Sequence, residues 1–123
     1  MPRTPPLDQV RRMQAQQGIV HGQRQDLEEA FKNFDALITP TSPTVAFRLG
    51  EKTQNSVDMY LSDVCTIPVN IAGIPAISVP CGFSDGLPIG MQFMGPAWSE
   101  PTLLRLGYAY EQSTEWHKSR PVF

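Results

Sequence analysis

Two serines and two cysteines are the candidate nucleophiles of the nearly uncharged stretch 59–83, MYLSDVCTIPVNIAGIPAISVPCGF: Ser62, Cys65, Ser78 and Cys81. A catalytic serine needs a neighbouring general base, and many hydrolases present it on a sharp Gly-x-Ser-x-Gly turn. Ser78 instead lies in an apolar run that predicts a strand, and no such turn surrounds it. Ser62 has no evident base nearby. Both serines are therefore predicted to be structural.

The cysteines could act as nucleophiles only with a histidine, and the chain has two, His21 and His117. His21 lies in the weaker half of a predicted helix. His117 lies near the end of another, where the helix dipole alone favours a cation. Cys65 and Cys81 lack the spacing of metal ligands and lie among apolar residues. We expect buried, reduced thiols rather than a disulfide or a Cys–His pair.

Other parts of a catalytic centre are also missing from the sequence. The three lysines, Lys32, Lys52 and Lys118, lie in polar contexts that predict exposure, so none is expected to be a desolvated base. The sequence has no phosphate-binding loop, dinucleotide fingerprint or metal-ligand cluster. The residues alone predict no complete catalytic machinery in this chain.

Asp63 is the one acidic residue of the stretch 59–83. A carboxylate among Tyr60, Leu61 and Val64 would be costly if it were buried without a partner. Two interpretations remain open. In one, Asp63 faces water or caps a nearby backbone group; in the other, it faces a cleft and pairs with a cationic group of a ligand.

The composition indicates a small globular unit or a piece of a larger one. The chain has 123 residues, 41% of them hydrophobic, and a net charge of −2, which gives no general affinity for nucleic acid or membranes. No apolar run approaches the roughly 18 residues of a membrane span, and the N-terminus lacks a signal-peptide pattern. Residues 1–25 carry four arginines against one aspartate. They form either a solvated helix face or a basic arm that touches RNA.

The first third of the chain predicts a helix, a strand and two loops. Residues 7–34 predict the helix, whose second half has a core-facing apolar stripe: Leu27, Ala30, Phe31 and Phe34. Residues 36–38 predict a short buried strand. Residues 39–43, TPTSP, then form a rigid loop that lines a cleft or makes a structural corner, because its prolines restrict the neighbouring backbone. Residues 44–57 predict an exposed polar loop.

Residues 76–83 and 88–95 predict the two strands of a hairpin, joined by the turn Ser84-Asp85-Gly86. Alternation places two sets of side chains each on one face: Ile77, Val79, Cys81 and Phe83, and Ile89, Met91 and Phe93. Pro80 and Pro88 cannot donate to a ladder, so parts of the hairpin are expected to be irregular or at an edge.

Two more helices are predicted. Residues 57–72 fit a helical period, and Pro68 should break or kink this helix near Thr66. Ser99-Glu100-Pro101 is a helix start, with a capping side chain, an acid in the first turn and an early proline. Pro121 is predicted to end this last helix. Its buried face holds Leu103, Leu106, Gly107, Tyr110 and Thr114. The order of elements predicts an α/β fold with a small mixed sheet and flanking helices, too few to cover both faces of the sheet.

Four segments, in this order, carry a resemblance to a known family: DALITPTSPTVAFRLGEK, MYLSDVCTIPVNIAGIPAISVPCGF, GLPIGMQFMG and TLLRLGYAYEQSTEWHKSRP. They resemble the C-terminal part of the amidase signature family, and within it the A subunits of the bacterial tRNA-dependent amidotransferases. The resemblance runs from about residue 25 to residue 123. It implies two parts: a divergent basic helical N-terminus, 1–24, and the C-terminal segment of an amidase domain, 25–123, with a partial α/β/α fold.

The resemblance also implies a function. In such enzymes a serine, assisted by a second serine and a lysine, attacks the side-chain amide of glutamine. The released ammonia reaches the B subunit, which uses ATP and Mg²⁺ to amidate Glu-tRNA(Gln) or Asp-tRNA(Asn), while the small C subunit holds the other two together. The implied partners are glutamine, subunits B and C, and tRNA mainly through the B subunit, in the bacterial cytoplasm and without a membrane. No cofactor is implied for this chain itself.

The serine–serine–lysine part of the family pattern is absent from this sequence, so we expect a truncated amidase that is inactive alone. One role of the family does map onto it: Asp63 corresponds to an aspartate that binds the α-amino group of glutamine. Gln92, in a family-typical Gly-x-Gln motif, is expected to be a structural hydrogen bonder. Two alternatives remain: a non-catalytic remnant or interaction module, and a fragment of a general amidase without a tRNA link.

Overall fold

The computed structural model describes residues 22–122. A helix over residues 22–30 precedes three strands and three further helices. In chain order these are β1 (Leu37–Pro40), α2 (Ser56–Ser62), α3 (Ile67–Ala72), β2 (Ala76–Ser84), β3 (Leu87–Met94) and α4 (Glu100–Ser113), followed by the short 3₁₀ helix η1 (Trp116–Lys118). The predicted order of helices and strands is confirmed, with the second predicted helix divided into α2 and α3.

The break between α2 and α3 lies where the sequence predicted it. Pro68 has no N–H, and its ring would clash with the carbonyl of Val64 in a continuous helix. The chain instead leaves helical geometry after Ser62 and begins again at Ile67, so that Pro68 stands in the first turn of α3, where its missing N–H costs nothing. Asn55 caps the start of α2 by accepting a hydrogen bond from the N–H of Val57 (3.0 Å).

The hairpin of β2 and β3 turns at Asp85 and Gly86, as the sequence predicted. Both residues have positive φ angles, 50° and 76°, which is the backbone of a tight type I′ turn and explains the glycine. A register shift between Pro80 and Gly82 places Cys81 at a β-bulge. The irregularity expected at Pro80 is thus confirmed, and the regular alternation of β2 stops there. Phe83 lies beyond the bulge, where it is 41% exposed and contacts Trp116.

The sheet has the strand order β1-β3-β2, and every pairing among the described residues is antiparallel. The fold class is confirmed as α/β, but these strands do not form the mixed sheet that the sequence predicted. The physical reason is connectivity. The two-residue turn forces β3 to run against β2, and β1 pairs with the other side of β3 from Leu37↔Met94 to Pro40↔Met91.

Helix α4 packs on one face of this sheet. Leu103, fully buried, joins Val79 and Phe93 in the core, and partly buried side chains surround them: Ala36, Ile77, Met91, Leu106 and Tyr110. The predicted buried face of α4 is therefore confirmed. At Gly107 the helix comes so close that an added Cβ would lie 2.6 Å from Cδ1 of Ile77. Ser99 begins the helix, although its side chain makes no capping hydrogen bond.

Two predictions about helix ends are wrong. The first helix ends at residue 30 and tightens into a turn over 31–33, so Phe34 leaves the expected stripe and is 61% exposed. Helix α4 ends at Ser113 rather than near Pro121. The hydroxyls of Ser113 and Thr114 both donate to the carbonyl of Tyr110, at 2.9 and 3.0 Å, and such bonds compete with continuation of the helix.

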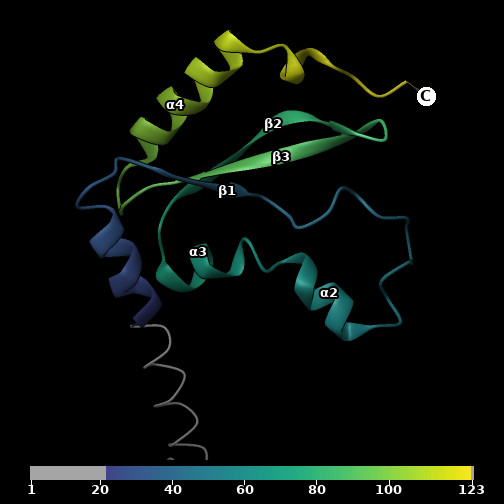
Figure 1. Cartoon of the computed structure of the whole chain (residues 1–123), viewed down its shortest axis with the longest axis horizontal. Helices are drawn as coiled ribbons and strands as arrows, with labels where there is room; N and C mark the ends of the chain where they lie inside the picture. The colour runs from purple at the N-terminus through teal and green to yellow at the C-terminus, as the bar shows by residue number, and fades with distance from the viewer. Residues whose placement is uncertain (1–21, 123) are drawn as a thin grey trace, which may run out of the picture.

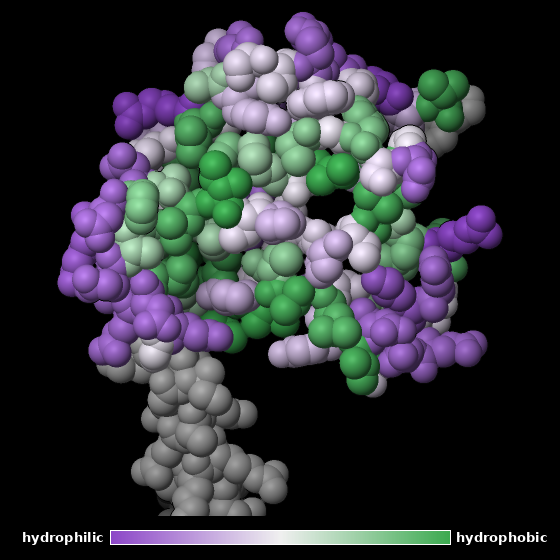
Figure 2. Space-filling view, viewed as in Figure 1, coloured by the Kyte–Doolittle hydropathy of each residue, from purple (hydrophilic) through white to green (hydrophobic). Residues whose placement is uncertain are grey.

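The elements form layers. Figure 1 shows α4 on one side of the sheet and α2 and α3 on the other. Helix α2 has no buried residue, and Val57, Tyr60 and Leu61 are each at least half exposed. Figure 2 shows hydrophobic residues at the surface in the region of α2 and α3. This side of the molecule therefore presents apolar surface that packing within residues 22–122 does not cover.

Candidate substrate site at the turn between α2 and α3

Asp63 stands at the C-terminal end of α2 and begins the turn that leads to α3. Its backbone N–H still belongs to α2, bonding to the carbonyl of Tyr60 at 3.1 Å. Its own carbonyl accepts three hydrogen bonds from the start of α3: from the N–H of Thr66 (3.0 Å), the hydroxyl of Thr66 (3.2 Å) and the N–H of Ile67 (2.9 Å). The backbone of Asp63 is thus the joint between the two helices, and its position is fixed on both sides.

The side chain of Asp63 is exposed, and within residues 22–122 its carboxylate has no hydrogen bond or ion pair. A costly buried and unpaired carboxylate is therefore excluded here. Of the two interpretations, residues 22–122 show the first in part: Asp63 faces water, but its side chain caps no backbone group, because the bonds that close the turn come from the backbone carbonyl. A fixed backbone that carries a free, exposed carboxylate can accept hydrogen bonds from a cationic group.

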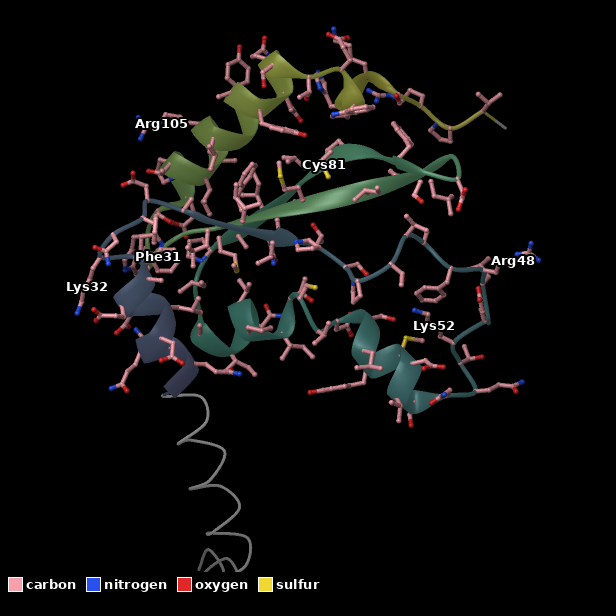
Figure 3. The ribbon with its side chains drawn as sticks, viewed as in Figure 1. Phe31, Lys32, Arg48, Lys52, Cys81 and Arg105 are labelled. Atoms are coloured by element: carbon pink, nitrogen blue, oxygen red, sulfur yellow. The ribbon has the colours of Figure 1, made fainter. Side chains whose placement is uncertain are left out.

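A polar cluster lies beside Asp63, around Ser62. The Lys52 ammonium donates to Oγ of Ser62 at 2.9 Å and lies 4.4 Å from the centre of the Phe47 ring. Figure 3 shows Lys52 between the loop that carries Arg48 and helix α2. Lys52 is half-buried rather than exposed as predicted, because the 44–57 loop brings it against Ser62 of α2, a contact that has no local signal in the sequence.

The Lys52–Ser62 contact does not amount to a nucleophile and its base. Nζ of Lys52 is the donor in this bond, so in this arrangement it does not accept the Ser62 hydroxyl hydrogen. The Ser62 hydroxyl in turn donates to the carbonyl of Asp58 at 3.0 Å, within its own helix. Ser42 adds a donated bond to the carbonyl of Ser62 at 3.4 Å. The cluster joins the end of α2 to the segment 42–52 through hydrogen bonds.

Ser78 lies on β2 and is exposed, and its structural role stays a prediction. Its hydroxyl lies 2.6 Å from that of Thr41, and the two meet above Gly90, where an added Cβ would lie 2.9 Å from both oxygens. Residues 40–47 and the far end of the hairpin line a cavity of about 710 Å³. The rigid loop 39–43 therefore does line a cleft, although Asp63 is not among the residues that border it.

The cysteines and histidines do not form a catalytic pair among the described residues. Cys65 and Cys81 are free thiols, but both are half-buried rather than buried as predicted; Cys81 lies on β2 (Figure 3). His117 lies in η1, and its Nδ1 is buried with no hydrogen-bond partner in the part of the chain that is described. His21 lies outside the described residues. No group of three or more His, Cys, Asp or Glu side chains within 22–122 could hold a metal ion.

Within the described residues, Gln92 makes the one side-chain hydrogen bond from the sheet to the turn near Asp63. Its side chain is buried, at 4% exposure. Its Nε2 donates both to Oγ1 of Thr39 and to the carbonyl of Cys65, each at 3.0 Å. Cys65 lies two residues beyond Asp63. The Gly-x-Gln motif indicated a structural role, but the sequence could not indicate the partner on the turn.

Comparison with known proteins agrees with this architecture. The amidase family model matches residues 6–104. The chain belongs to the amidase family. This match includes most of the segment 1–24 that sequence analysis set apart; because the structure describes only residues 22–24 of it, the division at residue 24 stays a prediction.

Among curated relatives, the chain is 62% identical over 98 residues to the glutamyl-tRNA(Gln) amidotransferase A subunit of Moorella thermoacetica, covering 80% of this chain and 20% of that protein. It is 63% identical over 94 residues to the first of the glutamyl-tRNA(Gln) amidotransferase A subunits of Clostridium acetobutylicum, covering 76% and 19%. The matched part is the C-terminal region of that protein. The amidase chain thus spans about a fifth of the length of the curated relatives that it matches.

Among solved structures, the A subunit of the glutamyl-tRNA(Gln) amidotransferase from Thermotoga maritima superposes with a TM-score of 0.72 at 32% identity, covering 91% of this chain and 28% of that one. A bacterial aryl acylamidase of the amidase signature family superposes with a TM-score of 0.79 at 24% identity, covering 92% and 26%. The second likeness shows the fold alone. No helix in residues 22–122 is long and apolar enough to cross a membrane.

Proposed function

We propose that this chain forms the substrate-binding wall of a glutamine-hydrolysing amidotransferase A subunit, and that Asp63 binds the α-ammonium group of glutamine. The observation that carries the proposal is the exposed carboxylate of Asp63, which is unpaired within residues 22–122 and held on a turn whose backbone is fixed from both sides. The identity of 62% to a glutamyl-tRNA(Gln) amidotransferase subunit supports the assignment of the substrate class.

The chemistry of glutamine explains why an isolated carboxylate is useful. Free glutamine carries an ammonium and a carboxylate at one end and the scissile amide at the other. A carboxylate that receives charge-assisted hydrogen bonds from the ammonium orients the substrate without touching the reacting amide. A general amidase acts on amides that carry no α-ammonium group. An Asp63-dependent preference for glutamine therefore separates the proposed function from that alternative.

In this proposal the catalytic groups lie in another part of the amidase domain. The nucleophilic serine, its serine partner and the lysine belong to the part of an amidase domain that this chain does not match. The exposed apolar side of α2 supports the proposal that this chain works against another part of such a domain, because a seven-residue helix with no buried residue gains little stability alone.

In the proposed complex this chain binds no cofactor itself. The B subunit uses ATP and Mg²⁺ to activate the aminoacyl-tRNA, receives the ammonia and makes most contacts to the tRNA, and the C subunit holds the other two together. Because the complex acts on an aminoacyl-tRNA, we place it in the bacterial cytoplasm.

The test is a glutaminase assay on reconstituted protein. This chain is mixed with the part of the Moorella thermoacetica protein that it does not match, and ammonia release from glutamine is measured with each part alone and with both. Activity is expected only with both. Asp63→Asn should raise KM for glutamine by roughly 10- to 100-fold, the value of a lost hydrogen bond to a charged group. Asp85→Asn, which changes an exposed aspartate to an equally suitable turn residue, is the matched control.

Association itself is measured in the same mixture. Leu61→Asp, on the exposed side of α2, should abolish co-purification with the Moorella part, whereas Leu104→Asp, at 65% exposure on α4, should not.

Glutamine turnover by this chain alone that is lost in Asp63→Ala would contradict the proposal, because a nucleophile would then have to exist within these 123 residues. A reconstituted enzyme with unchanged KM in Asp63→Asn would contradict the role of Asp63.

A further inference from the structure

Among residues 22–122, one side-chain hydrogen bond joins the sheet to the turn that carries Asp63, and its donor is Gln92. The backbone bonds of Asp63 define the shape of the turn but do not attach it to β3. The attachment comes from Gln92 on the central strand, whose Nε2 lies 3.0 Å from the carbonyl oxygen of Cys65. The free carboxylate of Asp63 is therefore two residues away from a point that is fixed to the sheet.

The chemistry of this contact requires a side-chain amide. The carbonyl of Cys65 is an acceptor only, so the group that faces it must be the NH₂ of Gln92, which has two hydrogens. The second hydrogen goes to Oγ1 of Thr39 on β1, also at 3.0 Å. A glutamate at this position cannot donate when ionised, and a methionine of similar shape cannot donate at all. One amide nitrogen thus joins β1, β3 and the turn.

The hydrogen bond from Gln92 to the Cys65 carbonyl is important because it is buried. Gln92 is only 4% exposed, so water does not readily replace the bonds that it makes. Its neighbour across the sheet in β2 is Ser78, which bonds to Thr41 and makes no bond to the turn. The two residues lie in the same cross-strand row of the sheet, but only Gln92 reaches the turn.

We propose that Gln92 is a positioning residue for substrate binding: it sets the place of the Asp63 carboxylate by holding the carbonyl of Cys65 against the sheet. This inference rests on the proposed function, since Asp63 is taken as the ligand of the α-ammonium group. It goes beyond that function by assigning the geometry of the site to a buried residue that does not touch the substrate.

The first experiment is hydrogen–deuterium exchange on the full chain, compared between the natural protein, Gln92→Met and Ser78→Ala. In Gln92→Met the amides of Thr66 and Ile67, which close the turn on Asp63, should exchange about 5- to 30-fold faster, as expected for the loss of a buried hydrogen bond. Amides of the β2–β3 hairpin should keep their protection. Ser78→Ala should leave the turn unchanged.

Two results of this experiment overturn the inference. One is unchanged exchange at Thr66 and Ile67 in Gln92→Met. The other is an equal increase in the turn and in the hairpin, which would mean that Gln92 stabilises the whole sheet and has no specific effect on the turn. Gln92→Leu serves as a second variant, with no hydrogen-bond donor at any pH, and should behave as Gln92→Met does.

The second experiment uses the reconstituted enzyme. Gln92→Met should raise KM for glutamine by about 5- to 30-fold with kcat within twofold, and should add little further to the KM of Asp63→Asn. If Asp63→Asn raises KM and Gln92→Met does not, the positioning role is wrong while the proposed function stands. If Asp63→Asn leaves KM unchanged, the proposed function fails and the role of Gln92 in substrate binding fails with it, whatever the exchange shows.

Discussion

Helix α4 lies close to the sheet at Gly107, and this contact allows a quantitative test of the packing. In Gly107→Ala the new Cβ would lie 2.6 Å from Cδ1 of Ile77, a distance that requires Ile77 or the helix to move. The next contact, 3.6 Å from Cγ1 of Val79, is an ordinary van der Waals distance. A single methyl group, Cδ1 of Ile77, is thus responsible for the conflict.

Two opposing contributions decide whether Gly107→Ala raises or lowers the free energy of unfolding. Alanine is better than glycine in a helix interior by about 1 kcal/mol. Forcing an extra methyl group into a packed core costs about 1–3 kcal/mol. Gly107→Ala should therefore lower the free energy of unfolding by up to about 2 kcal/mol. In an Ile77→Val background Cδ1 is absent, so the same substitution should raise the free energy of unfolding by up to about 1 kcal/mol, the helix term alone.

The assay is urea unfolding of the four proteins of this double-mutant cycle, followed by circular dichroism and tryptophan fluorescence. The expected coupling between Gly107→Ala and Ile77→Val is about 1–3 kcal/mol. Ala109→Gly, an exposed position on α4, is the control and should cost about 1 kcal/mol in both backgrounds. Equal effects of Gly107→Ala with and without Cδ1 would refute the packing of α4 on β2 described above.

Two further predictions concern the core and the end of the chain. Leu103→Ala should lower the free energy of unfolding by about 2–5 kcal/mol, because Leu103 is fully buried between α4 and the sheet; a loss below about 1 kcal/mol in the same urea assay would show that this core is not formed. The hydrogen bond and charge of Lys118 hold the pKa of Glu115 below its usual range. This ion pair therefore stabilises the native state at pH values above the ordinary glutamate pKa, and its contribution is lost as the pH falls through the lowered pKa. A carboxyl titration by NMR should therefore give a higher pKa for Glu115 in Lys118→Met; an unchanged pKa would exclude the pair in solution.

The sequence predicted those features that depend on neighbours along the chain. The Asp85-Gly86 turn needs two positive φ angles, and this residue pair is among the few that adopt them easily. Pro68 interrupts a helix whatever the helix packs against, because proline has no N–H to donate and its ring clashes with the preceding turn. The face of α4 follows from helical spacing, which brings Leu103 and Gly107 to the same side.

Features that depend on contacts across the chain could not be predicted. The pairing of β1 with β3 rather than with β2 has no local signal, so the sheet was expected to be mixed. The contact of Lys52 with Ser62 depends on how the 44–57 loop folds back, and that of Gln92 with Cys65 depends on the layer order of sheet and helices. The early end of α4 could have been inferred from Ser113 and Thr114, whose hydroxyls often bond to the preceding turn.

The central claim is that Asp63 recognises the α-ammonium group of glutamine. It is tested most directly in the reconstituted enzyme by comparing glutamine with its analogue that lacks the α-amino group, in the natural protein and in Asp63→Asn. The natural protein should prefer glutamine in kcat/KM by roughly 10- to 100-fold, and Asp63→Asn should lose this preference while retaining its activity on the analogue. A preference for glutamine that is equal in the two proteins would contradict the account.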